Sequence, residues 1–193
     1  MDLLYNVIMD IFKKFPSIIV IEKNISCKKI NKKTPLIKYA KKLAKFRNYF
    51  KDYFVDAKSV TIKGTTKYLT NIKDNKKKIM YLVYYKKKII GQYGVHQWDK
   101  GYIGLDGAMR ISKEGTKNLF YDIQKIILYL LKKNIPTCSP VIICHKKNLT
   151  ALKLHKKFKF KKINDKTKLK FFENYIISKK NKVSEFYIKE YII

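Results

Sequence analysis

The sequence predicts a single α/β domain in which helices flank a mixed, mostly antiparallel sheet. Three observations lead to this fold class. The length of 193 residues suits one domain with a core of its own. The expected order of elements is a strand, two helices, three strands, a helix, a strand, a helix and final strands. No internal repeat or long linker divides the chain, so residues 17–193 are expected to form the domain and residues 1–16 an extra N-terminal helix.

The N-terminal third supplies the first elements. Apolar residues recur at helical spacing before Pro16, at Leu3, Leu4, Val7, Ile8, Ile11, Phe12 and Phe15. This spacing predicts an amphipathic helix that packs on the domain, on a second copy in a homodimer or on a larger assembly. The β-branched run from Ser17 to Glu22 predicts a strand. Pro35 opens a helical pattern that continues to Arg47.

The middle of the chain predicts a meander. A short helix is expected from Thr65 to Ile72, followed by a charged turn from Lys73 to Lys78. Three strand candidates succeed one another, at 79–85, 89–98 and 102–111. Because short turns join them, we expect these strands to pair in an antiparallel arrangement.

The C-terminal half alternates helices and strands. Gly115 precedes a helix with one wide apolar stripe, which predicts that it covers a sheet face; the stripe is Leu119, Phe120, Ile123, Ile126, Ile127, Leu130 and Leu131. Val141 to Cys144 is the next expected strand, and Asn148 is expected to cap a helix that runs to Lys157. From Phe158 onward we expect one or two further strands, including one from Phe186 to Ile192.

The composition limits the classes of partner. The formal net charge is +31, and Arg47 and Arg110 are the only two Arg residues among the 45 cationic ones. The chain is also rich in Ile, Asn and Tyr, as an A/T-rich coding sequence would produce. We therefore expect a solvated Lys surface that attracts anionic substrates. A basic nucleic-acid-binding module without catalysis is the alternative, but it predicts exposed aromatic residues on one Lys-rich face, whereas Tyr and Phe here fall mostly at strand-core positions.

The chain is expected to be soluble and cytoplasmic. Cys27, Cys138 and Cys144 are odd in number and show no CxxC spacing, which argues against a disulfide framework and a zinc site. Three scattered His residues do not form a metal-ligand set, so no metal is expected. No apolar run approaches the ~20 residues that span a bilayer, and no cleavable signal segment is evident.

Two neighbouring strands carry an unusual set of side chains on one face. The turn from Asp99 to Gly101 suits a three-residue hairpin that pairs Trp98 with Tyr102. In the resulting register three pairs lie opposite each other on one face: His96 with Gly104, Gly94 with Asp106, and Gln92 with Ala108. Arg110 lies further along the same face. Such a face does not fill an apolar core, but it can line a ligand groove. A solvent-facing sheet surface is the alternative, although solvent faces elsewhere in this chain are rich in Lys.

Residues 141–160, VIICHKKNLTALKLHKKFKF, resemble the "V...N..A..LY.K.GF" segment of the GNAT superfamily of acyl-CoA N-acyltransferases. His155 stands where that pattern has Tyr, and Lys159 where it has Gly. The element order over residues 17–193 also matches the GNAT topology. The resemblance implies a GNAT-like fold, acetyl-CoA as the acetyl donor, and a strand that splays to admit the pantetheine arm.

The resemblance also implies a donor site. In GNAT proteins the last strand of the meander holds the acetyl carbonyl through its backbone amides. The next loop, Ser112 to Lys117, sits where the family has its pyrophosphate signature "Q/R-x-x-G-x-G/A", of which Gly115 alone is convincing. Backbone N–H groups at a helix start bind phosphate whatever the side chains are. The implied donor-binding residues are Met109, Ile111, Ser112, Lys113, Gly115, Thr116, Lys117 and Asn148.

A second resemblance concerns the acceptor. The segment LDGAMR resembles the "elDN.vRG" strand of GNAT members that acetylate nucleotide-linked aminosugars for surface polysaccharides, and Arg47 with Asn48 resembles their "RN" pair. The implied acceptor is a UDP- or dTDP-linked amino-deoxysugar bound by Arg47, Gln92, Trp98 and Arg110. A protein or polyamine amine is the alternative acceptor, although a strongly cationic enzyme would repel it.

The implied reaction assigns three catalytic candidates. An N-acetyl transfer needs a base for the amine, stabilisation of the oxyanion and an acid for the thiolate. Asp106 is the first candidate for the base, directly or through water, and His96 is the second. His155 is the candidate acid, and His145 is expected to be a surface residue. The degenerate phosphate loop and the missing Tyr would also suit a pseudo-enzyme.

Overall fold

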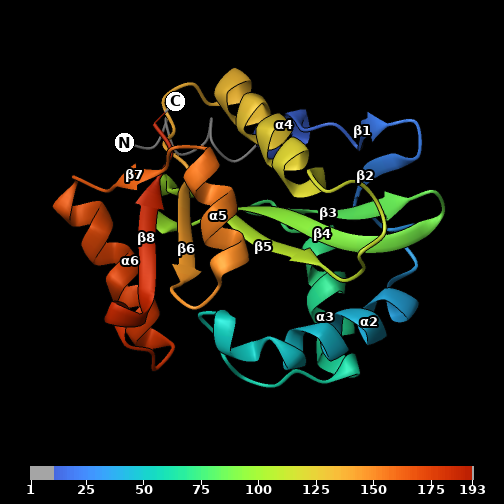
Figure 1. Ribbon diagram of the computed structural model, residues 1–193, viewed down its shortest axis with the longest axis horizontal. Coiled ribbons are helices and arrows are strands. Elements are labelled where there is room, and N and C mark those ends of the chain that lie inside the picture. The colour runs from blue at the N-terminus through green and yellow to red at the C-terminus, as the bar shows by residue number, and fades with distance from the viewer. Residues whose placement is uncertain (1–10, 193) are drawn as a thin grey trace.

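The computed structural model of the protein describes residues 11–192. Eight strands form one sheet in the order β1-β2-β3-β4-β5-β6-β8-β7. The β5–β6 pair is parallel, and the six other neighbouring pairs are antiparallel. Helices flank this sheet (Figure 1), so the predicted fold class is confirmed.

The N-terminal half contains the predicted helices and meander. Its elements are η1 (Ile11–Lys14), β1 (Ile18–Glu22), β2 (Ile25–Lys29), α2 (Leu36–Tyr49), η2 (Lys51–Tyr53), α3 (Ile62–Lys73), β3 (Lys78–Tyr85), β4 (Lys88–Gln97), η3 (Asp99–Gly101) and β5 (Ile103–Arg110). Strand β2 was not predicted, because it is short and alternates apolar with polar residues within a Lys-rich stretch. The expected N-terminal helix lies mostly outside the described residues, but Phe12 and Phe15 at its end are buried in the core.

The C-terminal half contains one helix that the sequence prediction missed. Its elements are α4 (Leu119–Asn134), β6 (Val141–His145), α5 (Leu149–Lys157), β7 (Lys161–Lys162), α6 (Lys166–Ser178), η4 (Val183–Glu185) and β8 (Phe186–Glu190). The strands expected after Phe158 are confirmed as β7 and β8, but helix α6 between them was not predicted. Asp165 caps α6 by accepting hydrogen bonds from the backbone of Thr167 and Lys168, at 2.8 and 3.0 Å.

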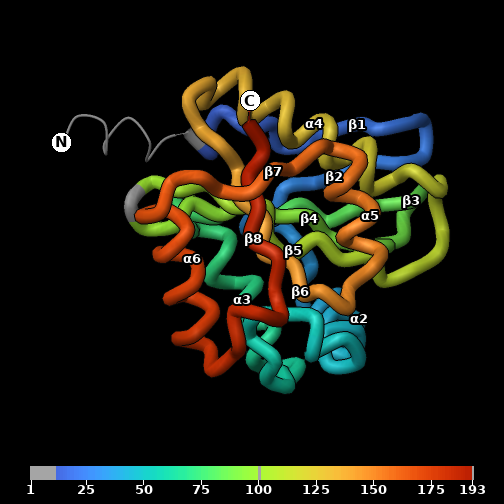
Figure 2. The backbone as a smooth tube through the Cα atoms, turned by 60° about the vertical axis from the view of Figure 1, so that its left-hand side comes forward, coloured from blue at the N-terminus to red at the C-terminus, as the bar shows by residue number. Residues whose placement is uncertain are grey.

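Helices cover both faces of the sheet. Helix α4 packs on one face together with Phe12 and Phe15, and α2 and α3 pack on the other (Figure 1). A third apolar cluster, built on Val141, Ile163 and Phe172, joins β6 to α6. Strands β1 and β7 are the two edges of the sheet. In Figure 2 β8 runs down the middle of the view, with α6 to its left and β1 and β2 toward the right. No helix within residues 11–192 is long and apolar enough to cross a membrane.

A bulge in β5 corrects the predicted register. Gly94 pairs with Asp106 as expected, but Gln92 pairs with Met109, so two residues of β5, Gly107 and Ala108, face one residue of β4. Gly107 has a φ of 65°, a left-handed conformation that suits glycine at a bulge. The extra residue reverses the faces of all later side chains. The expected pairing of Gln92 with Ala108 is therefore wrong, as is the placement of Arg110 on the face of Asp106.

Candidate active site

The sheet opens between its two parallel strands. β5 and β6 are paired at one position, Gly104 with Val141, near the start of β5. Because a bulge bends the strand that contains it, β5 turns away from β6 beyond this pair. The ends of the two strands point apart in Figure 1. Backbone groups of β5 along this gap have no sheet partner among residues 11–192, so they can bind a ligand that enters between the strands.

Three charged or titratable side chains meet beside this gap, on the face that α2 and α3 cover. Lys78 of β3 lies directly opposite His96 of β4, and His96 lies opposite Gly104 of β5. The Lys78 ammonium forms an ion pair with Oδ2 of Asp106 on β5. To reach Asp106, the Lys78 side chain must cross β4 beside Gly94, where no side chain obstructs it.

The charges in this cluster follow from the ion pair. Burial alone would raise the pKa of Asp106, but the Lys78 ammonium outweighs it and holds this pKa below its ordinary value. Burial would lower the pKa of Lys78, yet Asp106 raises it overall. Burial, followed by the charge of Lys78, lowers the pKa of His96. At neutral pH the cluster therefore contains a carboxylate, an ammonium and a neutral imidazole.

Aromatic side chains form the wall of this site. The ring centroid of Trp98 lies 4.6 Å from that of His96 and 4.3 Å from that of Tyr175 on α6. The Trp98 indole packs so closely on Gly104 that an added Cβ there would clash with its Nε1 atom. This Nε1 atom is buried and has no hydrogen-bond partner in the described part of the chain. Trp98 thus offers a donor to a bound molecule.

Three members of the site were not predicted from the sequence. Tyr68 on α3 has its ring 5.2 Å from the Lys78 ammonium, and Tyr175 belongs to the helix that was not predicted. Lys78 was placed in a turn before its strand. One signal could have identified it: extending the expected strand by one residue puts Lys78 on the face of His96 and Asp106.

Arg47, at the end of α2, has an unused donor. Its guanidinium carbon lies 3.8 Å from the centre of the Phe54 ring, and its Nη2 donates to the carbonyl of Asp56. The Nη1 atom is buried without a partner among the described residues. Asn48 has a structural role, because its amide group exchanges hydrogen bonds of 2.7 and 2.9 Å with the backbone of Val60. This contact fixes the loop before α3.

The other two expected acceptor-binding residues form part of the scaffold. Gln92 accepts a 2.6 Å hydrogen bond from the Tyr39 hydroxyl and donates a 2.9 Å bond to the carbonyl of Gly107. It therefore stabilises the bulge. The Arg110 guanidinium donates to three successive backbone carbonyls of the next loop, those of Ser112, Lys113 and Glu114, at 2.9 to 3.1 Å.

Arg110 thus shapes the loop that precedes α4. In this loop Gly115 has a φ of 91°. Oγ1 of Thr116 is buried and lacks a partner within residues 11–192, whereas Lys113 and Lys117 are exposed. The residue before α4, Asn118, makes no side-chain cap, and the exposed Lys113 and Lys117 precede it in the chain, so this helix start suits a phosphate group. The Met109 side chain is buried in the core, so it could contact a ligand only through its backbone.

Helix α5 presents His155 and Asn148. Asn148 caps the helix as predicted, because its Oδ1 accepts a 3.2 Å bond from the backbone of Ala151. Nδ1 of His155 is buried without a partner in the described chain, and burial lowers the pKa of His155 to about 4. The imidazole is therefore neutral at pH 7, and the role of His155 as the acid stays a prediction. The expectation that His145 is a surface residue is wrong, since it is buried with its ring 5.0 Å from that of Phe186.

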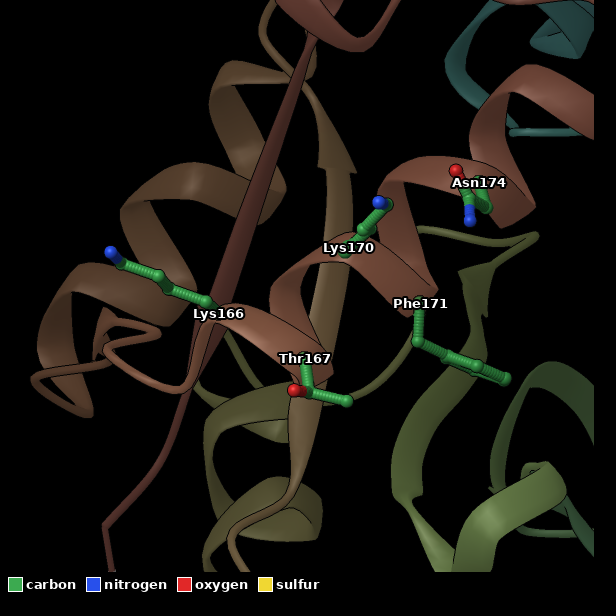
Figure 3. A pocket seen from close by; sticks show the side chains of 5 residues that line it. All are labelled: Lys166, Thr167, Lys170, Phe171 and Asn174. Carbon is green, nitrogen blue, oxygen red and sulfur yellow. The ribbon is translucent and has the colours of Figure 1, made fainter.

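An open hollow of about 300 Å³ lies elsewhere, along α6. Figure 3 shows that all its lining side chains project from this one helix: Lys166, Thr167, Lys170, Phe171 and Asn174. None of the candidate catalytic residues lines it. We therefore place the site at the opening between β5 and β6.

Comparisons with known proteins support the fold. No protein-family model matches the sequence, and no curated protein matches it either. Solved structures do match. An acetyltransferase from Salmonella typhimurium that modifies the N-terminal serine of ribosomal protein L7/L12 aligns with a TM-score of 0.62 at 10% identity, over 74% of this chain and 84% of that chain. A probable GNAT-family acetyltransferase from Chromobacterium violaceum aligns with a TM-score of 0.59 at 12% identity, over 77% and 76% of the two chains. The chain has the GNAT fold.

A third GNAT-like structure shows a bound donor. The microcin C7 self-immunity acetyltransferase MccE, in complex with acetyl-CoA and AMP, aligns with a TM-score of 0.57 at 18% identity, over 76% of this chain and 83% of that chain. At such identities the GNAT fold is shared, but individual residues need not be.

Proposed function

We propose that the protein is an N-acetyltransferase that transfers the acetyl group of acetyl-CoA directly to an amine. The observation that carries this proposal is the opening between β5 and β6, with the cluster of Lys78, His96 and Asp106 beside it. The opening can admit an extended chain that ends in a thioester. The cluster provides titratable groups where an amine would lose its proton.

The loop before α4 and helix α5 offer groups that could bind acetyl-CoA. The loop held by Arg110 leads to the start of α4, which suits the pyrophosphate. Two buried polar atoms without partners in the described chain, Oγ1 of Thr116 and Nδ1 of His155, could hydrogen-bond to the donor. Lys113 and Lys117 would add positive charge. The donor supplies the thioester, and these residues would bind and orient it.

For the acceptor we propose a UDP- or dTDP-linked amino-deoxysugar. The buried Nη1 of Arg47 can hydrogen-bond to a phosphate oxygen, and the Trp98 indole can donate to a sugar hydroxyl. Asp106 is already paired with Lys78, so this carboxylate cannot serve as the sole counter-ion for a cationic acceptor. These features favour an anionic acceptor over the alternative, a protein or polyamine amine.

Two measurements in the same tubes test this proposal. Thermal unfolding with increasing acetyl-CoA should show a midpoint that rises with its concentration, since binding to the folded state stabilises it. Thiol release should then occur with one or more UDP- or dTDP-linked 3-amino or 4-amino sugars. Absence of any stabilisation by acetyl-CoA would contradict the donor assignment. Stabilisation with thiol release for polyamines or peptides alone would contradict the acceptor assignment.

A pair of variants on α2 tests the role of Arg47. Arg47→Met should raise the KM for the aminosugar nucleotide by about 10-fold or more, because a charge-assisted hydrogen bond to phosphate is lost. Lys45→Met removes one positive charge from an exposed position of the same helix and should leave KM nearly unchanged. If both substitutions changed KM equally, Arg47 would contribute only its charge and no specific contact with the phosphate.

A further inference from the structure

Lys78 differs from most lysines of this chain in its surroundings. Its side chain is 12% exposed, and its ammonium lies between the Asp106 carboxylate on β5 and the Tyr68 ring on α3. A lysine on β3 reaches a carboxylate two strands away because Gly94 leaves room on β4. At Gly94 an added Cβ would lie 2.7 Å from the carbonyl oxygen of Asp106, so the position accepts no side chain without rearrangement.

This ion pair restricts what Asp106 can do. One carboxylate oxygen is taken up by Lys78, and the same contact stabilises the ionised form. A carboxylate whose conjugate acid is strong takes a proton from an ammonium poorly. Asp106 is therefore better suited to fixing charge and geometry than to removing a proton.

His96 is the neighbouring group that can accept a proton. It lies opposite Lys78 on one side and diagonal to Asp106 on the other, with the Trp98 ring 4.6 Å away. Of the charges that face it, Lys78 lowers its pKa and Asp106 raises it. Asp99 raises the pKa of His96 and Lys77 lowers it, and these two residues form an ion pair with each other at 3.2 Å. The imidazole thus stays neutral, and so able to accept a proton, at neutral pH.

We propose that Lys78 is a positioning residue which holds the Asp106 carboxylate, and that His96, in place of Asp106, accepts the proton that the acceptor amine loses. This inference rests on the proposed acetyltransferase function. The ammonium form of the acceptor gives one proton to His96, which later releases it to solvent. The neutral amine attacks the thioester carbon and forms the C–N bond. As the C–S bond breaks, the second proton leaves the nitrogen and ends on the sulfur as the coenzyme A thiol.

The arrangement can be tested without any substrate by NMR titration of the His96 ring. Lys78→Met removes the cation that lowers the pKa of His96, so the titration midpoint of the His96 ring should rise. Asp106→Asn removes the anion that raises it, so the midpoint should fall. Lys78→Arg should restore the wild-type midpoint, whereas Lys77→Met is the matched control on a more exposed lysine and should shift it less. If neither Lys78→Met nor Asp106→Asn moves the titration midpoint of His96, the inference is overturned and the proposed function is left intact.

Rates of thiol release with acetyl-CoA and a UDP- or dTDP-linked aminosugar then test the catalytic role. His96→Gln should lower kcat by about 100-fold or more. It should also abolish the fall of kcat/KM toward low pH, which is the acidic limb of the pH profile. Asp106→Asn should keep that limb, displaced to lower pH, and Lys78→Met should displace it to higher pH. If Asp106→Asn abolishes the limb while His96→Gln keeps it, Asp106 is the base and the inference is wrong. If no amine supports thiol release, the proposed function fails, and the role of His96 in it fails too.

Discussion

His155 shows how one buried side chain couples the stability of this protein to pH. Its Nδ1 atom is buried without a partner among residues 11–192, and its ring lies 5.5 Å from that of Phe160. Burial, aided by the charge of Lys189, lowers the pKa of His155 to about 4. The folded state therefore favours the neutral imidazole, while the unfolded chain binds a proton near the ordinary pKa of about 6.5.

Stability should fall as the pH is lowered through this interval. The contribution of His155 is complete above about pH 6.5 and is lost progressively toward pH 4, by about 3 kcal/mol in all. Urea unfolding at pH 7.5 and pH 4.5 measures this loss. His155→Gln should show a clearly smaller difference between the two pH values than the wild type. If His155→Gln showed the same difference as the wild type, the His155 ring would be protonated at pH 4.5 as readily in the folded state as in the unfolded chain, and its pKa would not be lowered.

At the scale of single elements, α6 forms one wall of the candidate site. It brings Tyr175 to the Trp98 ring, and Asn181, just beyond its end, donates to the carbonyl of Val55 in the loop before α3. A buried ion pair ties this helix to β8. Lys168 bonds to Glu190 at 2.7 Å and to the carbonyl of Ser139 at 3.0 Å, with side-chain exposures of 10% and 13% for the pair.

Removing one partner of this pair should destabilise the protein strongly. Lys168→Met leaves the Glu190 carboxylate buried without its cation, which should lower the free energy of unfolding by about 3 to 5 kcal/mol. The double variant Lys168→Met/Glu190→Gln should recover part of this loss, as a double-mutant cycle by urea unfolding would show. Lys170→Met, at an exposed position of the same helix, is the control and should change stability by about 0.5 kcal/mol or less. A loss below about 1 kcal/mol for Lys168→Met would show that water reaches the pair.

At the scale of the whole molecule, the net charge of +31 sets the response to salt. Like charges distributed over a folded surface repel one another, and dissolved ions screen this repulsion within about 10 Å at 0.1 M. Only four ion pairs between side chains are found among the described residues, which leaves most lysines without a counter-charge.

We expect the thermal unfolding midpoint to rise as NaCl increases from about 20 to 300 mM. Over the same range kcat/KM for an anionic acceptor should fall, because screening weakens its attraction to the cationic surface. KCl should act like NaCl if screening is the cause. A midpoint that is independent of salt would indicate that the charges are too far apart to destabilise the fold.

Local patterns in the sequence predicted the order of most elements and the face that carries His96 and Asp106. Apolar periodicity reveals α4, and the hairpin turn ending at Gly101 fixes the first pairs of the register, because both signals are local. The cap at Asn148 was recognisable for the same reason. Helix α6 has a comparable cap at Asp165, but its aromatic residues lie among lysines, and it was missed.

Which residues meet depends on contacts between segments that lie far apart in the chain. One extra residue at the Gly107 bulge turns the Arg110 side chain away from the expected groove and toward the loop before α4. A bulge forms only where a strand pairs with another strand, so the sequence of β5 does not reveal it. Lys78 is one lysine among many in the sequence, and it becomes part of the site only because β4 places Gly94 between it and Asp106. Likewise, the pKa of His155 is lowered by burial that no local sequence pattern reports. Contacts between distant segments therefore decide the chemistry of the site, while local patterns decide its scaffold.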